Sequence, residues 1–194
     1  SDFMQYIVTA LEMKNIEKYV IEEVGIPSLV LMERAALSVT ECIKKRTVLN
    51  EKICIVCGQG NNGADGIAIA RLLNEKGIYT EICKVNELLT QKGTVSASYK
   101  VQEEIYGTYH YPVQNDISEI LEDSYDFVID AVFGIGLSRI LSEEYTQIVQ
   151  HINEVKGTKV AVDMPSGINS DNGYSNGSRF SLRMRDFSNS CSIS

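Results

Sequence analysis

Apolar and polar positions near the amino terminus repeat with the period of a helix. Apolar residues recur every three or four positions from Ala10 to Val24 and again from Leu29 to Lys45, which predicts two consecutive helices. Gly25 and Pro27 separate the two stretches, and Ser28 is expected to cap the second helix through its hydroxyl. The chain is therefore expected to begin with a helical pair.

Further along, short apolar runs that predict buried strands alternate with helical stretches. The expected strands are Ile53 to Cys57, Tyr79 to Val85, Tyr109 to Val113, Tyr125 to Val132 and Lys159 to Val162. The expected helices are Asp65 to Glu75, Ala97 to Ile105 and Ser142 to Val155. This alternation predicts an α/β fold in which helices cover both faces of a mostly parallel sheet.

Composition excludes several classes of protein. The 194 residues, 44% apolar and 23% charged, suit one globular domain. A net charge of −8 argues against nucleic acid as a partner, and the absence of an apolar run of about 18 residues argues against a membrane span. Two histidines without zinc-ligand spacing argue against a zinc hydrolase. Five cysteines, an odd number, and no signal segment predict a reducing, cytoplasmic location.

The last residues, 178–194, differ in character from the rest of the chain. They contain six serines, and three arginines against one aspartate give this tail a charge of +2. Neither an apolar period nor turn residues stand out, so the tail is expected to be disordered or foreign to the fold.

The first glycine-rich loop, residues 58–66, follows the strand that ends at Cys57 and precedes a helix. Gly58, Gly60 and Gly63 satisfy the GxGxxG pattern, which lets backbone amides approach a phosphate at the start of a helix. A nicotinamide dehydrogenase would place an acid at the end of the next strand, where this chain has residues 83–86, Cys-Lys-Val-Asn. The pattern alone also allows a tight turn without a ligand.

Two more strands end in an aspartate followed by glycines. Asp130 precedes Gly134, Gly136 and Arg139, which suit a phosphate, and Asp163 precedes Ser166 and Gly167. Because carboxyl ends of parallel strands share one edge, the three loops are expected to converge there with Asp65 and Asn62. Asp130 could instead cap a turn. Ser166 lacks the GxSxG setting of a serine nucleophile.

Other reactive residue types have simpler interpretations. Cys54 and Cys57 form a CxxC inside a predicted strand, where positions three apart face opposite sides, so both are expected to be buried strand residues. His110 and His151 have ordinary neighbours and are expected to be incidental.

Four ordered motifs together resemble one known family. They are GIPSLVLMERAA, GQGNNGADG, DAVFGIGLSR and DMPSGINSDNG, and they resemble the YjeF amino-terminal domain, the NAD(P)H-hydrate epimerase family, over residues 4–177. The resemblance implies a Rossmann-like three-layer α/β/α sandwich with a mostly parallel sheet and two amino-terminal helices. It also implies an isomerase that interconverts the R and S forms of hydrated NADH and NADPH (NADHX and NADPHX) at ring carbon C6.

The same resemblance implies roles for individual residues. Asp163 is the expected catalytic acid and base. The first group expected to bind the hydrated dinucleotide is Asn61, Asn62, Gly63, Ala64 and Asp65. The second group, around the phosphates, is Gly134, Ile135, Gly136, Leu137, Ser138, Arg139 and Ile140. The expected ligands of one potassium ion per subunit are Asn62, Asp130 and Ser166, whose hard oxygen donors suit such a cation.

Partners and alternatives follow from the family. The resemblance implies a homodimer, and some members are fused to a dehydratase that consumes one epimer. Ala64 and Ala36 stand where the family has glycine, and both changes are expected to be tolerated. One alternative is a non-catalytic nucleotide- or protein-binding scaffold of the same fold. Another is a conventional NAD(P) oxidoreductase, which the missing ribose acid disfavours.

Overall fold

The computed structural model describes residues 20–48, 50–85, 95–132, 143–163, 180–184 and 190–193. The helical elements are η1 (Val20–Val24), α2 (Ser28–Lys44), α3 (Asn61–Glu75), α4 (Ala97–Thr108), η2 (Ile117–Glu119) and α5 (Glu143–Glu154). The strands are β1 (Ile53–Cys57), β2 (Thr80–Lys84), β3 (Val113–Gln114), β4 (Ser124–Ala131), β5 (Lys156–Asp163), β6 (Phe180–Met184) and β7 (Ser190–Ile193). Helix and strand alternate from β1 to β5, as the apolar pattern predicts.

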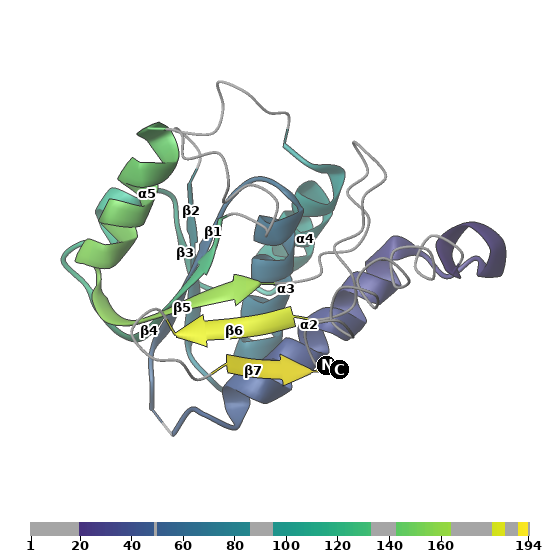
Figure 1. The fold of residues 1–194 in the computed structure, drawn as a ribbon, viewed down its shortest axis with the longest axis horizontal. Coiled ribbons are helices and arrows are strands. Elements are labelled where there is room, and N and C mark those ends of the chain that lie inside the picture. The colour runs from purple at the N-terminus through teal and green to yellow at the C-terminus, as the bar shows by residue number, and fades with distance from the viewer. Residues whose placement is uncertain are drawn as a thin grey trace, which may run out of the picture.

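The strands form one seven-stranded sheet in the order β3-β2-β1-β4-β5-β6-β7 (Figure 1). The pairs from β3 to β5 are parallel, and β6 and β7 join in antiparallel pairing. After β3 the chain crosses back and places β4 on the other side of β1. In such sheets the crevice where the strand order reverses is the usual ligand position, here between the carboxyl ends of β1 and β4.

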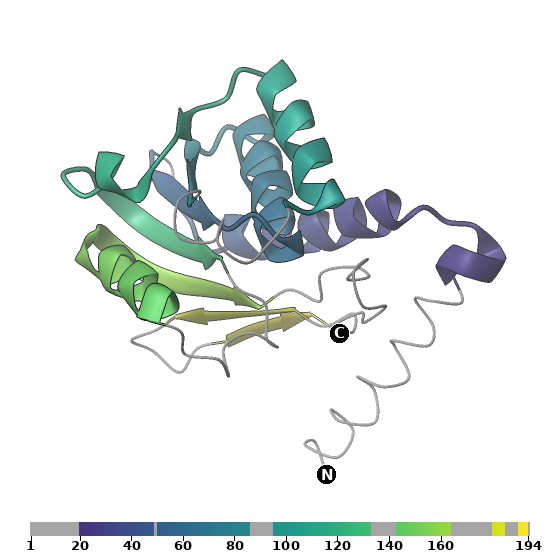
Figure 2. The ribbon, with the colours of Figure 1, turned by 90° about the horizontal axis from the view of Figure 1, so that it is seen from above.

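Two apolar cores lie on opposite faces of the sheet. Alternate residues of β1 divide between them: Ile53, Ile55 and Cys57 pack with α2, α3 and α4, whereas Cys54 and Val56 pack with α5. Figure 2 shows α2, α3 and α4 on one side of the sheet and α5 on the other. The predicted three-layer α/β/α architecture is therefore confirmed.

Several predicted elements have the wrong boundaries, and β5 begins at Lys156 rather than at Lys159. Helix α3 begins at Asn61 rather than Asp65, because Gly60 has extended backbone angles and takes the N-cap position. Pro27, not Ser28, caps α2, and no side chain contributes a capping hydrogen bond there. The predicted strand from Tyr109 is shortened to Val113–Gln114, because α4 runs to Thr108.

Tyrosine packing explains the short third strand. The rings of Tyr109 and Tyr111 stack with centroids 5.2 Å apart, and Tyr106 meets Tyr111 edge to face at 5.7 Å. His110 between them has a left-handed backbone with φ of 56°. These aromatic residues favour strand by propensity, but here they close the end of α4 and turn the chain toward β3.

The carboxyl-terminal tail differs from its expected character. Phe180–Met184 and Ser190–Ile193 form β6 and β7, and β6 extends the sheet beyond β5. The sequence of β6 alternates apolar Phe180, Leu182 and Met184 with polar residues, which is the period of a strand. The high serine and arginine content concealed this short alternation. The division of the chain at residue 177 stays a prediction.

At the amino terminus, Val20–Val24 of the predicted first helix forms a π-helical turn, and the earlier residues of that prediction lie outside the described residues. None of the helices in the described part of the chain is both long and apolar enough to cross a membrane.

Candidate functional site

The carboxyl ends of three neighbouring strands bring the predicted acids to one edge of the sheet. Asp130, the penultimate residue of β4, pairs with Val56 of β1 on one side and with Ala161 of β5 on the other. Asp163 is the last residue of β5, and Asn61 begins α3 soon after β1 ends. The expected convergence is therefore confirmed for the backbone of these positions.

Among the described residues of this edge, Asn62 and Asp65 give the clearest indication of a ligand or ion site. Their side chains lie one helical turn apart on α3, which places them on one face. Both residues are buried, with exposed fractions of 5% and 1%. Neither carboxamide atom of Asn62 and neither carboxylate oxygen of Asp65 has a hydrogen-bond partner. Because an unsatisfied buried polar group costs about 1–3 kcal/mol, such a pair points to a bound ligand or ion.

Burial also sets the protonation of Asp65. It raises the pKa of this carboxyl well above its ordinary value, because no neighbouring donor or cation compensates the lost hydration. A neutral carboxyl has one hydrogen-bond donor and one free acceptor oxygen. In the protonated form, which this shift favours, Asp65 can donate to a ligand oxygen as well as accept from a ligand hydroxyl.

Asp130 has a structural role that the sequence also allowed. One of its carboxylate oxygens, Oδ1, accepts a hydrogen bond of 3.0 Å from the backbone N–H of Val132, which fixes the turn at the end of β4. Its exposed fraction is 9%. A carboxylate has about four lone-pair positions, so turn capping and a role in cation binding are compatible.

The glycines of the first loop allow α3 to begin close to the sheet. A Cβ on Gly63 would lie 1.6 Å from the carbonyl oxygen of Gly58, and a Cβ on Gly58 would lie 2.6 Å from that of Val132. Backbone therefore touches backbone where α3, β1 and β4 meet. This close approach directs the start of α3 toward the crevice. The start of a helix favours anions.

Hydrogen bonds join the start of α4 to Gln59 and Asn61, and the sequence pattern does not predict them. The Ser98 hydroxyl donates to Oδ1 of Asn61 at 2.6 Å, and the backbone N–H of Ser96 donates to the carbonyl of Gln59 at 3.0 Å. Ser96 also caps α4 by accepting from the N–H of Tyr99 at 3.1 Å. In the sequence, the feature that indicates these bonds is the pair Ser96 and Ser98 at the start of a predicted helix.

Several predicted site residues lie outside the described residues. These are the phosphate-loop positions Gly134 to Ile140 and the potassium ligand Ser166. For Asp163 the structure gives the backbone at the end of β5. Across the described ranges, no three side chains of histidine, cysteine, aspartate or glutamate gather as a metal site.

The CxxC pair has the expected arrangement. Cys54 and Cys57 are free, buried thiols in the two opposite cores, and burial raises the pKa of each well above its ordinary value. Both thiols are therefore poor nucleophiles at neutral pH.

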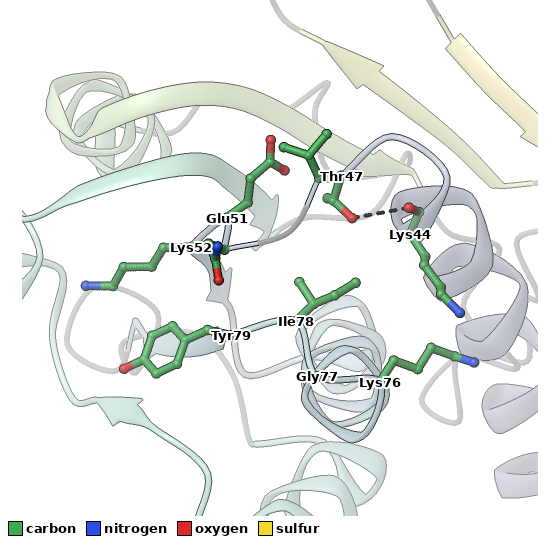
Figure 3. A pocket seen from close by; sticks show the side chains of 10 residues that line it. Lys44, Thr47, Glu51, Lys52, Lys76, Gly77, Ile78 and Tyr79 are labelled. Atoms are coloured by element: carbon green, nitrogen blue, oxygen red, sulfur yellow. Dashed lines mark hydrogen bonds between the residues drawn. The ribbon is translucent and has the colours of Figure 1, made fainter.

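A cavity of about 550 Å³ lies at the opposite end of the sheet, before β1 and β2 begin (Figure 3). Two of its cationic residues already have partners: Lys76 pairs with Glu41 at 2.7 Å, and Lys52 lies 3.6 Å from Glu81 and over the Tyr125 ring. Because ligands of parallel sheets bind at the carboxyl ends of strands, this cavity is not the candidate site.

Comparisons with known proteins agree with this arrangement. A family model described as YjeF-related protein N-terminus matches residues 28–184. The NAD(P)H-hydrate epimerase of Limosilactobacillus fermentum is 41% identical over 166 residues, which cover 86% of this chain and 77% of that protein. The NAD(P)H-hydrate epimerase of Oenococcus oeni is 40% identical over 167 residues, with 86% and 77% covered.

The fold is also that of a solved relative. The crystal structure of the yeast protein ynu0 matches with a TM-score of 0.63 at 23% identity and covers 84% of this chain and 70% of that one. The family match spans most of the chain and includes the glycine loop, the buried Asn62 and Asp65, and both strand-end aspartates. The chain belongs to the YjeF-related protein N-terminus family.

Proposed function

We propose that this protein is an NAD(P)H-hydrate epimerase, an isomerase that interconverts the R and S forms of hydrated NADH and NADPH. The observation that carries the proposal is the buried, unpartnered pair Asn62 and Asp65 beside Asp130 at the switch point of the sheet. Relatives that are about 40% identical over most of the chain have this activity in their names, which supports the same reaction here.

In this proposal the dinucleotide binds across the crevice between β1 and β4. Residues 61–65 contact it from the first turns of α3, where the helix start favours negative charge. Asp65 faces it as a buried carboxyl that can both donate and accept. As the family resemblance implies, residues 134–140 would bind the phosphates.

A potassium ion fits the oxygen donors of this edge. Asn62 has a buried carboxamide oxygen without a partner, and Asp130 adds a carboxylate on the neighbouring strand. These two residues and Ser166 would hold the ion, since hard cations prefer oxygen ligands. When bound, it supplies positive charge that offsets repulsion between the carboxylates and the anionic dinucleotide.

Asp163 acts as the acid and base. The lone pair of the ring nitrogen forms a double bond to C6 as the C6–O bond breaks, and the departing oxygen takes a proton from Asp163 to leave as water. The resulting cationic iminium is stabilised by the carboxylate. A water molecule then adds to C6 from either face and returns its proton to Asp163, so the reaction is balanced without a cofactor.

The activity is tested by following purified R-NADHX as it converts to its S form, by chromatography or NMR, with and without the protein. We expect acceleration over the spontaneous rate in potassium buffer and a lower rate in potassium-free buffer. A folded protein that binds the dinucleotide without accelerating the conversion would favour the non-catalytic scaffold.

Asp163→Asn removes the titratable carboxyl group but keeps the size of the side chain. We expect epimerisation to slow by about 100-fold or more, because general acid and base catalysis contributes about that much. Binding of the hydrated dinucleotide, measured by calorimetry, should stay within a few fold of wild type. Full activity of this variant would exclude Asp163 as the acid and base.

We further propose a homodimer that uses the outer face of α2. Leu29, Val30 and Leu37 on this helix are 41%, 45% and 40% exposed, which is unusual for large apolar side chains so close together. Sedimentation equilibrium of wild type and of Val30→Glu tests this surface: we expect a dimer that the charge dissociates.

Two further expectations also remain proposals. One is action together with a dehydratase, and the other is a cytoplasmic location. Cofractionation from the native host tests both.

A further inference from the structure

We propose that Ser98 is a positioning residue for this epimerase: it fixes the carboxamide of Asn61 in one orientation for the hydrated dinucleotide. This inference rests on the proposed function for its purpose, but its geometry is independent of it. Asn61 is the first residue of α3, at the edge of the crevice, and Ser98 lies in the first turn of α4.

A chain of hydrogen bonds from α4 ends at Asn61. The Ser98 hydroxyl donates to Oδ1 of Asn61 at 2.6 Å. The hydroxyls of Ser96 and Ser98 lie 3.2 Å apart, and either could donate when this pair is taken alone. The Ser96 hydroxyl also accepts from the backbone N–H of Tyr99 at 3.1 Å.

The number of hydroxyl hydrogens determines which serine donates in each of these bonds. A hydroxyl has one hydrogen to donate, and Ser98 gives its hydrogen to Asn61. The hydrogen between the two serines therefore comes from Ser96. The bonds then run in one direction, from the backbone of α4 through Ser96 and Ser98 to Asn61, and each hydroxyl both accepts and donates.

Backbone contacts also hold this chain of hydrogen bonds in place. The backbone N–H of Ser96 donates to the carbonyl of Gln59, within the same glycine loop that precedes Asn61. The start of α4 is thus attached to the loop through backbone as well as through side chains. Ser98 is held in place by elements of both α3 and α4, which suits a residue that orients a neighbour.

The hydrogen bond to Asn61 has a chemical consequence for the ligand. An asparagine carboxamide has an acceptor oxygen and a donor nitrogen that diverge from one carbon, so a bond to Oδ1 determines the direction of Nδ2. An oriented donor suits the phosphate and hydroxyl oxygens of a dinucleotide. Without Ser98 the carboxamide loses the hydrogen bond that fixes the position of its oxygen.

The kinetic test compares Ser98→Ala with Ser98→Thr, which keeps a hydroxyl. We expect Ser98→Ala to raise the KM for R-NADPHX by about 5- to 10-fold, the effect of one hydrogen bond, with kcat within about twofold. Ser98→Thr should restore most of the affinity. Ser38→Ala on α2, whose hydroxyl bonds the carbonyl of Arg34 in its own helix, is the matched control and should leave KM unchanged.

A double-mutant cycle tests whether Ser98 acts through Asn61. In the Asn61→Ala background, Ser98→Ala should have little further effect on KM, because the group that it orients is gone. If Ser98→Ala raises KM by its full factor in that background, or leaves KM unchanged in the wild type, the inference is wrong.

A measurement without activity separates this inference from the proposed function. In a ¹⁵N-labelled protein, the side-chain amide of Asn61 should have a high order parameter that falls in Ser98→Ala and is retained in Ser98→Thr. An unchanged order parameter would overturn the positioning role even in an active enzyme. Failure of wild type to epimerise would overturn the proposed function and leave the orienting bond measurable.

Discussion

At the scale of single residues, Asp65 shows how strongly the site departs from ordinary interior packing. A fully buried carboxyl without a partner reduces the stability of the free protein, because the charged form loses hydration and gains nothing in return. Folded proteins keep such groups where function requires them. The same environment that makes Asp65 costly gives it the neutral form that can donate to a ligand.

The substitution Asp65→Asn tests whether the buried carboxyl reduces the stability of the free protein. Because burial raises the pKa of Asp65, the unfolded chain releases the proton above about pH 4 while the folded chain keeps it. Stability is therefore full below about pH 4 and is lost as the pH rises through the higher pKa of the folded state. The variant cannot ionise, so its melting temperature relative to wild type should increase from pH 4 to pH 8, by about 2–4 °C for each kcal/mol.

Differential scanning fluorimetry without ligand or potassium measures this difference. Glu104→Gln, on the exposed side of α4, is a matched control that should show no such trend. A difference between Asp65→Asn and wild type that is independent of pH, or that falls as pH rises, would contradict the assignment.

At the scale of elements, the turn from β1 into α3 determines where the site lies. Gly58 and Gly63 are required because other backbone occupies the position of a Cβ atom. Gly60, the middle glycine of the GxGxxG pattern, has no such neighbour within 4 Å. The pattern in the sequence treats the three glycines alike, whereas packing distinguishes them.

Two alanine substitutions test that distinction. Gly63→Ala places a methyl group against the carbonyl oxygen of Gly58, so it should displace the start of α3 and destabilise the protein by about 3 kcal/mol or more. Gly60→Ala has room and φ of −91°, so it should change stability by less than about 1 kcal/mol. Urea unfolding measures both, and equal effects would show that the close approach is not the cause.

The predicted elements and the observed ones agree best where an apolar run is short and buried. Both ends of the strand Ile53–Cys57 are predicted correctly, because the run of five apolar residues is bounded by Lys52 and Gly58. The prediction places the start of helix α3 too late, because Asn and Gly have low helix propensity, whereas tertiary contacts with the loop after β1 and with α4 hold the first residues of the helix. The expected ligand loop is therefore a helix start.

At the scale of the whole molecule, β6 and β7 decide how the sheet ends. Strand β5, which carries Asp163, pairs with β6 from Val160 to Asp163. Without β6, the last residues of β5 would form an exposed edge, and Asp163 would lose its pairing with Ser181. The tail therefore supports the strand that carries the proposed acid and base.

Truncation tests this role. A chain that ends at Gly177 should melt at a lower temperature, aggregate more and epimerise more slowly than the full chain. A chain that ends at Met184 keeps β6 and should lose less, because β5 stays paired. Thermal melting and light scattering measure the series. If the shortest chain equals the full one, residues 178–194 are dispensable and the predicted division at residue 177 is supported.

The sequence by itself determined the alternation of strands and helices, the positions of strand-end aspartates and the glycine loop, because local period and residue type encode these features. The tertiary structure decided which strands are neighbours, and so that Asp130 lies between β1 and β5. It also decided that Asn62 and Asp65 are buried without partners and that Ser98 bonds Asn61 across two helices. Such contacts join residues far apart in the chain, and no local period specifies them.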